Sequence, residues 1–252
     1  MPSPTPDQRL AERERPAGAI VGRQRWNHLL FAHWKVSAAT VQATLPRGLH
    51  VDTFAGDAYL GIVPFFMQRN RPAWLPPLPW VSWFLELNVR TYVHDAVGRP
   101  GVWFYSLDCN QPIAVALARR FFHLPYHRAR MTAERRGPST VLTSQRRTPG
   151  SPACRYAWRE GAGGTAAAPG SRDFFLVERY RLFAADAAGR LFTGRVHHAP
   201  YRLHVPAVTE FSAAPARPAG FTLAGEPDSL LAARPVDVAL YPLSPVTPSA
   251  TP

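Results

Sequence analysis

Alternating apolar and polar residues recur along the chain and predict β-strands more often than helices. The clearest run covers residues 83–93, where one face is largely apolar and the other carries Glu86, Asn88 and Arg90 in succession. Because neighbouring side chains of a strand point to opposite faces, these three polar groups are expected on one side of a sheet. An acid, an amide and a base in a row make this strand the first candidate for a functional site.

Short helices interrupt the strands where capping residues and prolines allow them. Ser37 can cap a helix that Pro46 ends, and Asn110 with Pro112 can begin a second helix that Pro125 stops. The remaining predicted elements are a one-turn helix after Ser171 and strands near residues 49–54, 58–67, 101–108, 126–136, 139–147, 153–160, 191–198, 202–210 and 236–241. This order predicts a mainly β (α+β) fold, a closed or nearly closed antiparallel barrel with a few short helices.

The two ends of the chain differ from the rest. Residues 1–19 are polar, with acidic and basic side chains that cancel, and are expected to be a disordered lead; residues 245–252 are expected to be a disordered tail. Residues 20–244 are then expected to form one domain. The longest uncharged apolar stretch, residues 72–85, has 14 residues and four prolines, fewer than the ~20 that cross a bilayer. We therefore expect a cytoplasmic protein with no membrane partner.

Composition supports a packed core and adds one strongly basic segment. The chain has 252 residues, 46% of them apolar, and a formal net charge of +12. Ten arginines fall between Arg119 and Arg159, against Glu134 alone. Arginines that alternate on strands are usually solvated, so weak, salt-sensitive attraction to polyanions is expected rather than specific nucleic-acid recognition. A nucleic-acid-associated protein using residues 119–159 is kept as the second alternative.

Few residues have the spacing of a metal or cofactor site. Cys109 and Cys154 lie far apart, the histidines lack the spacing of zinc ligands, and the glycines at 161–164 follow no βαβ unit. No metal and no cofactor are expected. The sequence leaves the oligomeric state open.

Several long blocks, in order, resemble a known family. From RWNHLLFAHWKV (25–36) through FLELNVRTYV (84–93) and ARRFFHLPYHRARM (118–131) to VHHAPY (196–201) the chain is similar to the YqjF-like family of uncharacterised bacterial proteins. That family resembles, more remotely, the acetoacetate decarboxylase-like superfamily. The resemblance implies a strand-rich barrel with a buried cavity for a small keto acid.

The remote resemblance also implies roles for particular residues. On the match of FLELNV and SLDCNQPIAVALARRFFHLPYH, Glu86 takes the place of the pocket glutamate and Arg119 that of the helix arginine. Tyr126 and His127 stand where the reactive lysine pair of the decarboxylase belongs. Imine catalysis needs an amine, and the single lysine of the chain, Lys35, is far from this motif. The fold is therefore expected without the imine chemistry.

The resulting hypothesis is a barrel cavity that binds a small carboxylate or carbonyl compound. In it Arg90 binds the anion, Glu86 positions the ligand or transfers a proton, and Tyr126 polarises a carbonyl. Arg119 would be the near partner of Glu86. The ligand-binding residues are expected to be Asn88, Arg90, Arg119 and His127 and the catalytic ones Glu86 and Tyr126. The first alternative is a structural or interaction protein with a filled barrel, in which the charged residues only fix strand register.

A second charged motif, ERY at 178–180, poses the same choice. Glu178 and Tyr180 are expected to share one face of a strand, with Arg179 on the other. Pairing of Glu178 with an arginine across the sheet is its simplest use.

Overall fold

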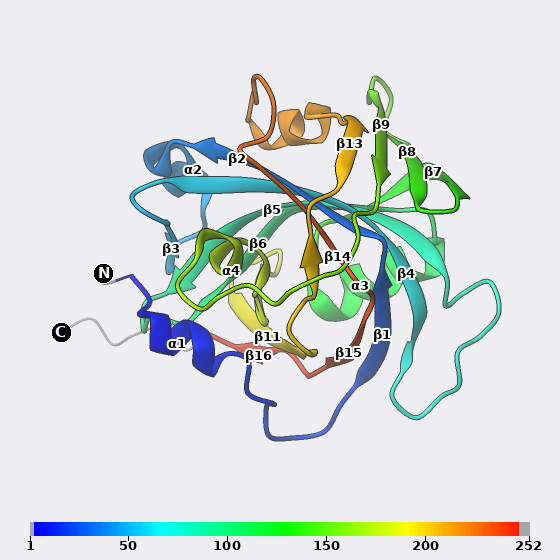
Figure 1. Ribbon diagram of the computed structural model, residues 1–252. Coiled ribbons are helices and arrows are strands. Elements are labelled where there is room, and N and C mark those ends of the chain that lie inside the picture. Colours follow the sequence, from blue (N-terminus) through cyan, green and yellow to red (C-terminus); the bar gives the residue numbers. More distant parts are fainter. Residues whose placement is uncertain (1–2, 247–252) are drawn as a thin grey trace.

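The computed structural model describes residues 3–246, and in this part of the chain 16 strands join one sheet (Figure 1). The strands are β1 (Gly22–Asn27), β2 (Leu29–Val36), β3 (Leu49–Val51), β4 (Ala58–Pro72), β5 (Phe84–Asp95), β6 (Pro100–Cys109), β7 (Tyr126–Arg136), β8 (Ser139–Arg146), β9 (Ala153–Arg159), β10 (Arg181–Ala185), β11 (Leu191–His197), β12 (Leu203–His204), β13 (Ala207–Glu210), β14 (Ser229–Ala233), β15 (Val236–Leu240) and β16 (Ser244–Pro245). The helices are α1 (Pro6–Ala11), α2 (Ala38–Thr44), α3 (Pro112–Phe122), α4 (Arg172–Val177) and the 3-10 helix η1 (Ala214–Ala219).

Seven of the strands close into a ring. Strand β5 pairs with β4 and β6; from β4 the pairing continues through β1, β15, β11 and β10, and β10 pairs with β6. Two wings extend from this ring, β2–β14–β12 beside β4 and β7–β8–β9–β13 beside β6. The expected closed or nearly closed barrel is confirmed, with two parallel pairs, β6–β7 and β6–β10, among the antiparallel ones.

Strand β5 is buried along its whole length and sorts its side chains by face. Leu85 and Leu87 pack in an apolar cluster with Leu142 of β8 and Trp158 of β9. The alternate residues, including Glu86, face the interior of the ring. The alternation of side chains along β5 therefore gives the strand two faces, as the sequence predicted. One is apolar and packs against the β7–β8–β9–β13 wing, and the other is polar and faces the interior of the ring.

Helix α3 begins at Pro112 as predicted, but its N-cap is Gln111 rather than Asn110, whose side chain accepts a hydrogen bond from the Leu85 amide. The side-chain oxygen of Gln111 accepts a hydrogen bond from the free backbone amide of Ile113 in the first turn. His123 ends the helix in the left-handed conformation, with φ 50°. Ala118 and Phe122, four residues apart, turn toward the ring interior. No helix among residues 3–246 is long and apolar enough to span a membrane.

The N-terminal lead differs from the prediction of disorder. Residues 6–11 form helix α1, capped by Thr5 and Gln8 in a capping box. Arg9 of this helix forms an ion pair with the buried Asp52, so the segment is fixed by contacts that are distant in sequence. At the other end, residues 244–245 pair with β11, and residues 247–252 of the predicted tail lie outside the described residues.

The arginine-rich segment lies on the wing formed by β7, β8 and β9. Arg128, Arg130 and Arg155 are exposed there, whereas Arg146 forms a 2.7 Å ion pair with Asp108. Most of this charge is carried by strands and faces solvent, as the alternation predicted.

Candidate binding cavity

A cavity of about 310 Å³ lies inside the strand ring. Its walls are mostly apolar, with Phe31 of β2, Val63 of β4 and Leu107 of β6 among them, and the ends of α3 and β7 complete the wall. At about 30 Å³ per molecule in liquid water, the volume equals roughly ten waters. The strand ring therefore leaves unfilled space of about the size of a small organic molecule.

Glu86 projects into this cavity and is only 2% exposed. Its Oε2 accepts a 2.8 Å hydrogen bond from the hydroxyl of Tyr126, at the start of β7. Burial raises the pKa of Glu86 to about 8, against the opposing effect of hydrogen bonds from Tyr126 and Asn88. At neutral pH Glu86 is mainly a neutral acid that can give up a proton near pH 8.

Tyr126 is buried beside this acid. Burial, followed by the nearby Glu86, raises the pKa of Tyr126 well above 10. Its hydroxyl therefore stays protonated and acts as a donor. The acid and the phenol, which the sequence proposed as neighbours, are in direct contact.

Asn88 lies between the two charged positions of β5 and also lines the cavity. Its side chain hydrogen-bonds Glu86, while its Oδ1 is buried without a hydrogen-bond partner in the described structure. An unpaired buried carbonyl is costly. This oxygen is available to a ligand hydroxyl or N–H group.

Arg90 is the cation of the inner face and is 8% exposed. Its Nη2 donates to the Leu176 carbonyl at 3.2 Å and reaches the Tyr92 hydroxyl at 3.5 Å, and its guanidinium lies 5.4 Å from the ring centroid of Phe31. Within residues 3–246 it has no carboxylate partner, and its Nε makes no hydrogen bond. A buried cation without an anion is unfavourable until one arrives.

Two predicted site residues lie elsewhere. Arg119 is exposed on α3 and does not line the cavity, because it lies about 100° around the helix from Ala118. His127 follows Tyr126 on β7 and therefore points to the opposite face. Burial and the positive charges of Arg146 and Arg119 lower the pKa of His127 to about 4. The prediction that Arg119 pairs with Glu86 is wrong. Glu86 needs no cationic partner, because it is mainly protonated at neutral pH and accepts a hydrogen bond from Tyr126.

The single lysine also lies away from the cavity. Lys35, at the end of β2, is about half exposed and forms a 2.7 Å ion pair with Asp57. The hydrogen bond to Asp57, and then its charge, raise the pKa of Lys35. This amine is protonated at neutral pH and lies outside the cavity wall.

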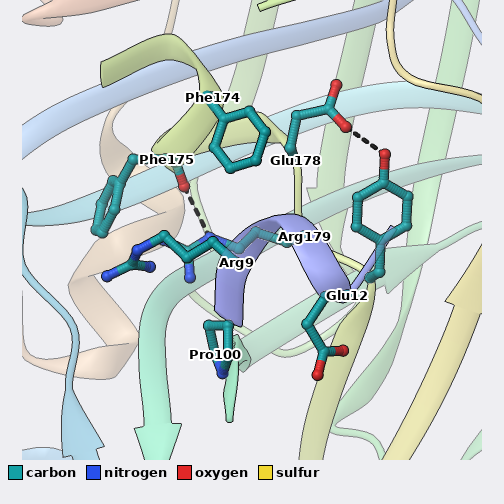
Figure 2. A pocket seen from close by; sticks show the side chains of 8 residues that line it. Arg9, Glu12, Pro100, Phe174, Phe175, Glu178 and Arg179 are labelled. Carbon is teal, nitrogen blue, oxygen red and sulfur yellow. Dashed lines mark hydrogen bonds between the residues drawn. The ribbon is translucent and has the colours of Figure 1, made fainter. Parts of the chain in front are cut away.

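The sequence missed a group of arginines at one end of the cavity: Arg179, Arg181 and Arg195. Unlike Arg90, they have acidic partners: Arg179 pairs with Asp52, and the other two pair with Glu12 after helix α1. Figure 2 shows Arg9 and Arg179 together between α1 and the phenylalanines of α4. The N-terminal segment thus neutralises this end of the cavity.

Glu178 does pair with an arginine, although not across the sheet. It caps the C-terminal end of α4, accepts hydrogen bonds from the Tyr180 hydroxyl and the Tyr201 amide, and lies 3.5 Å from Arg13 (Figure 2). The partner comes from the N-terminal lead. Glu178 does not line the cavity inside the ring.

Comparison with known proteins agrees with this architecture. Residues 23–237 match the model of DUF2071, a family of uncharacterised conserved proteins, and the chain belongs to this family. It is 38% identical over 229 residues to the uncharacterised protein YqjF of Bacillus subtilis (strain 168), with 90% of this chain and 93% of that protein covered.

Solved structures with a similar fold include two kinds of enzyme. Acetoacetate decarboxylase from Legionella pneumophila gives a TM-score of 0.63 at 12% identity, with 94% of each chain covered. The enduracididine biosynthesis enzyme MppR in complex with pyruvate gives 0.59 at 13% identity, with 93% of each chain covered. At these identities the likeness concerns the fold.

Proposed function

We propose that this protein binds a small organic acid inside the barrel, with the carboxylate of the ligand on Arg90. The observation that carries the proposal is a buried guanidinium that faces a mostly apolar cavity and has no acidic partner among the described residues. An anion that enters removes the cost of the uncompensated charge, and the low polarity of the walls strengthens the attraction. A cavity of about 310 Å³ favours this function over a barrel filled by its own side chains.

The ligand would meet a second polar group at its other end. Glu86 and Arg90 are four residues apart, which corresponds to about 13 Å along a strand, and the guanidinium of Arg90 turns toward Tyr92 and Leu176. A compound with a carboxylate at one end and a carbonyl or hydroxyl at the other can contact both. Asn88 Oδ1 lies between these positions.

The acid and phenol pair suits proton transfer at a carbonyl compound. Tyr126 and the neutral form of Glu86 can donate to a carbonyl oxygen, whereas the carboxylate form of Glu86 can remove a proton from the adjacent carbon. A pKa of about 8 for Glu86 makes both forms accessible near physiological pH. We therefore propose keto acids as the first ligands to test, a choice that the pyruvate complex of MppR also supports.

The first test compares acids with their uncharged esters by calorimetry. We expect a keto acid whose carbonyl lies several carbons from its carboxylate to bind at least about tenfold more tightly than its methyl ester, because only the acid gives Arg90 a charge-assisted partner. Chloride and phosphate at the same ionic strength serve as controls for the high net charge. Equal affinity for acid and ester would contradict the proposal.

A second test concerns imine chemistry. Because the remote resemblance puts Tyr126 and His127 at the positions of the lysine pair, and Lys35 does not line the cavity, borohydride with acetoacetate is expected to leave no substrate-dependent covalent adduct. Intact-protein mass spectrometry measures this directly, with an acetoacetate decarboxylase as the positive control. A stoichiometric adduct on Lys35 accompanied by turnover would overturn the expectation.

A further inference from the structure

Exposed apolar side chains are concentrated in two segments. Among residues 3–246, eight of the twelve large apolar residues that are exposed lie in the loop between β4 and β5 or on α3. We call them the aromatic patch; its members are Trp74, Leu75, Leu78, Trp80, Trp83, Ile113, Leu117 and Phe121. Trp74 and Trp80 are 72% and 70% exposed. Tryptophans rarely remain this exposed without a partner, and such concentrations mark interaction sites.

The loop holds these tryptophans outward by a defined structure. Ser82 is buried; its hydroxyl accepts from the Leu78 amide at 2.9 Å and its carbonyl accepts from Asn70. Trp80 has a left-handed backbone with φ 68°, and its carbonyl accepts a 3.1 Å hydrogen bond from Gln111 at the start of α3. The loop extends beyond the sheet at the right of Figure 1. These hydrogen bonds fix the conformation of the loop, and in that conformation its tryptophans are exposed.

Both segments of the patch also border the cavity. Pro72 at the end of β4, Val81 of the loop, and Ala118 and Phe122 of α3 line the cavity wall. On α3 Leu117, which is half exposed, also lines the cavity, and Phe121 lies one turn further along the helix on the same face. The aromatic patch is thus continuous with one wall of the cavity.

The charged side chains carried by the two segments of the patch, and by the end of β4 at the base of the loop, are all positive. Arg69 and Arg71 lie at the base of the loop, and the guanidinium of Arg120 lies 5.7 Å from the ring centroid of Phe121. Residues 69–83 and 111–124 contain no Asp or Glu. A second copy docked through a twofold axis would bring this positively charged face against another copy of itself. An anionic partner is favoured instead.

We propose that the aromatic patch docks on an anionic lipid surface. Tryptophan at the level of the headgroups and arginine beside lipid phosphates are the residue types that stabilise proteins at a membrane interface. No spanning helix is needed, so the absence of a spanning segment in the sequence does not bear on this contact. The cavity wall formed by α3 and the loop then lies next to the lipid.

Vesicle flotation with the full-length protein tests the proposal. Wild-type protein should bind phosphatidylcholine vesicles that contain about a quarter phosphatidylglycerol at least about tenfold better than pure phosphatidylcholine. The double variant W74S/W80S should lose at least about tenfold in binding to the anionic vesicles. Val205→Ser, at a residue that is equally exposed elsewhere, should change nothing. Circular dichroism and thermal unfolding establish that each variant is folded.

The contribution of charge is tested with matched arginine pairs. R69Q/R71Q should weaken binding to anionic vesicles more than R128Q/R130Q, which removes two exposed charges from β7. The proposal would be overturned if the two arginine pairs caused equal losses of vesicle binding, or if the wild-type protein bound neither kind of vesicle. So would a wild-type oligomer in sedimentation velocity that W74S/W80S converts to monomers without any vesicle binding, because that result assigns the patch to self-association.

Discussion

Arg90→Met is expected to stabilise the unliganded protein by about 1–2 kcal/mol and to weaken carboxylate binding at least about thirtyfold. The side chain is buried and has no anion among the described residues, so removing the charge relieves a desolvation cost that exceeds the loss of its hydrogen bond to Leu176. A substitution that raises stability but weakens ligand binding is typical of a residue whose function costs the protein stability. Urea unfolding and calorimetry with a keto acid measure the two quantities.

Arg179→Met is the matched control. Arg179 is as buried as Arg90 and also borders the cavity, but it forms a 2.8 Å ion pair with Asp52. Its removal leaves a buried carboxylate with one partner fewer and should destabilise the protein by about 3 kcal/mol or more. If both variants destabilised the protein equally, Arg90 would be a structural residue and the binding proposal would lose its main support.

The inner face of β5 was readable from the sequence because its information is local. A strand repeats every two residues whatever surrounds it, so Glu86, Asn88 and Arg90 had to share a face. Tyr126 was found through the family resemblance. Arg119 was wrongly placed in the site because the residue match took no account of the helical period of α3. On this helix Ala118 and Phe122 point inward, whereas Arg119 does not.

The N-terminal segment was misread because its partners are distant. Locally its alternating charges cancel, which is typical of a solvated lead. In the fold Glu12 meets Arg181 and Arg195, more than 160 residues away, and no periodicity encodes such a contact. The Thr5–Gln8 spacing of a capping box was a usable signal for α1. Sequence reasoning thus recovers elements and faces more readily than pairings between them.

Glu86→Gln is expected to remove a marked loss of stability that accumulates in the wild-type protein as pH rises from about 4 to about 8. Folded protein keeps the proton of Glu86 up to about pH 8, whereas an unfolded chain releases it near its usual pKa of about 4.3. Between these values the native state binds more protons than the unfolded state, so the unfolding free energy falls as pH rises. The difference between wild type and E86Q should be constant below about pH 4 and should change in favour of the variant by about 3–5 kcal/mol by pH 9.

Tyr126→Phe tests whether the Glu86 to Tyr126 contact sets this pH range. The Tyr126 hydrogen bond opposes the effect of burial on the pKa of Glu86, so its loss should raise that pKa further and extend the pH-dependent loss of stability to higher pH. Chemical unfolding of wild type, E86Q and Y126F from pH 4 to about pH 10 measures all three curves. If keto acids exchange their α-protons on the protein, the same carboxylate acts as the base, and exchange should rise toward a plateau above about pH 8 in wild type and be lost in E86Q. A wild-type unfolding curve parallel to that of E86Q across this range would show that Glu86 is ionised in the folded state, and the proton-transfer role would then be wrong.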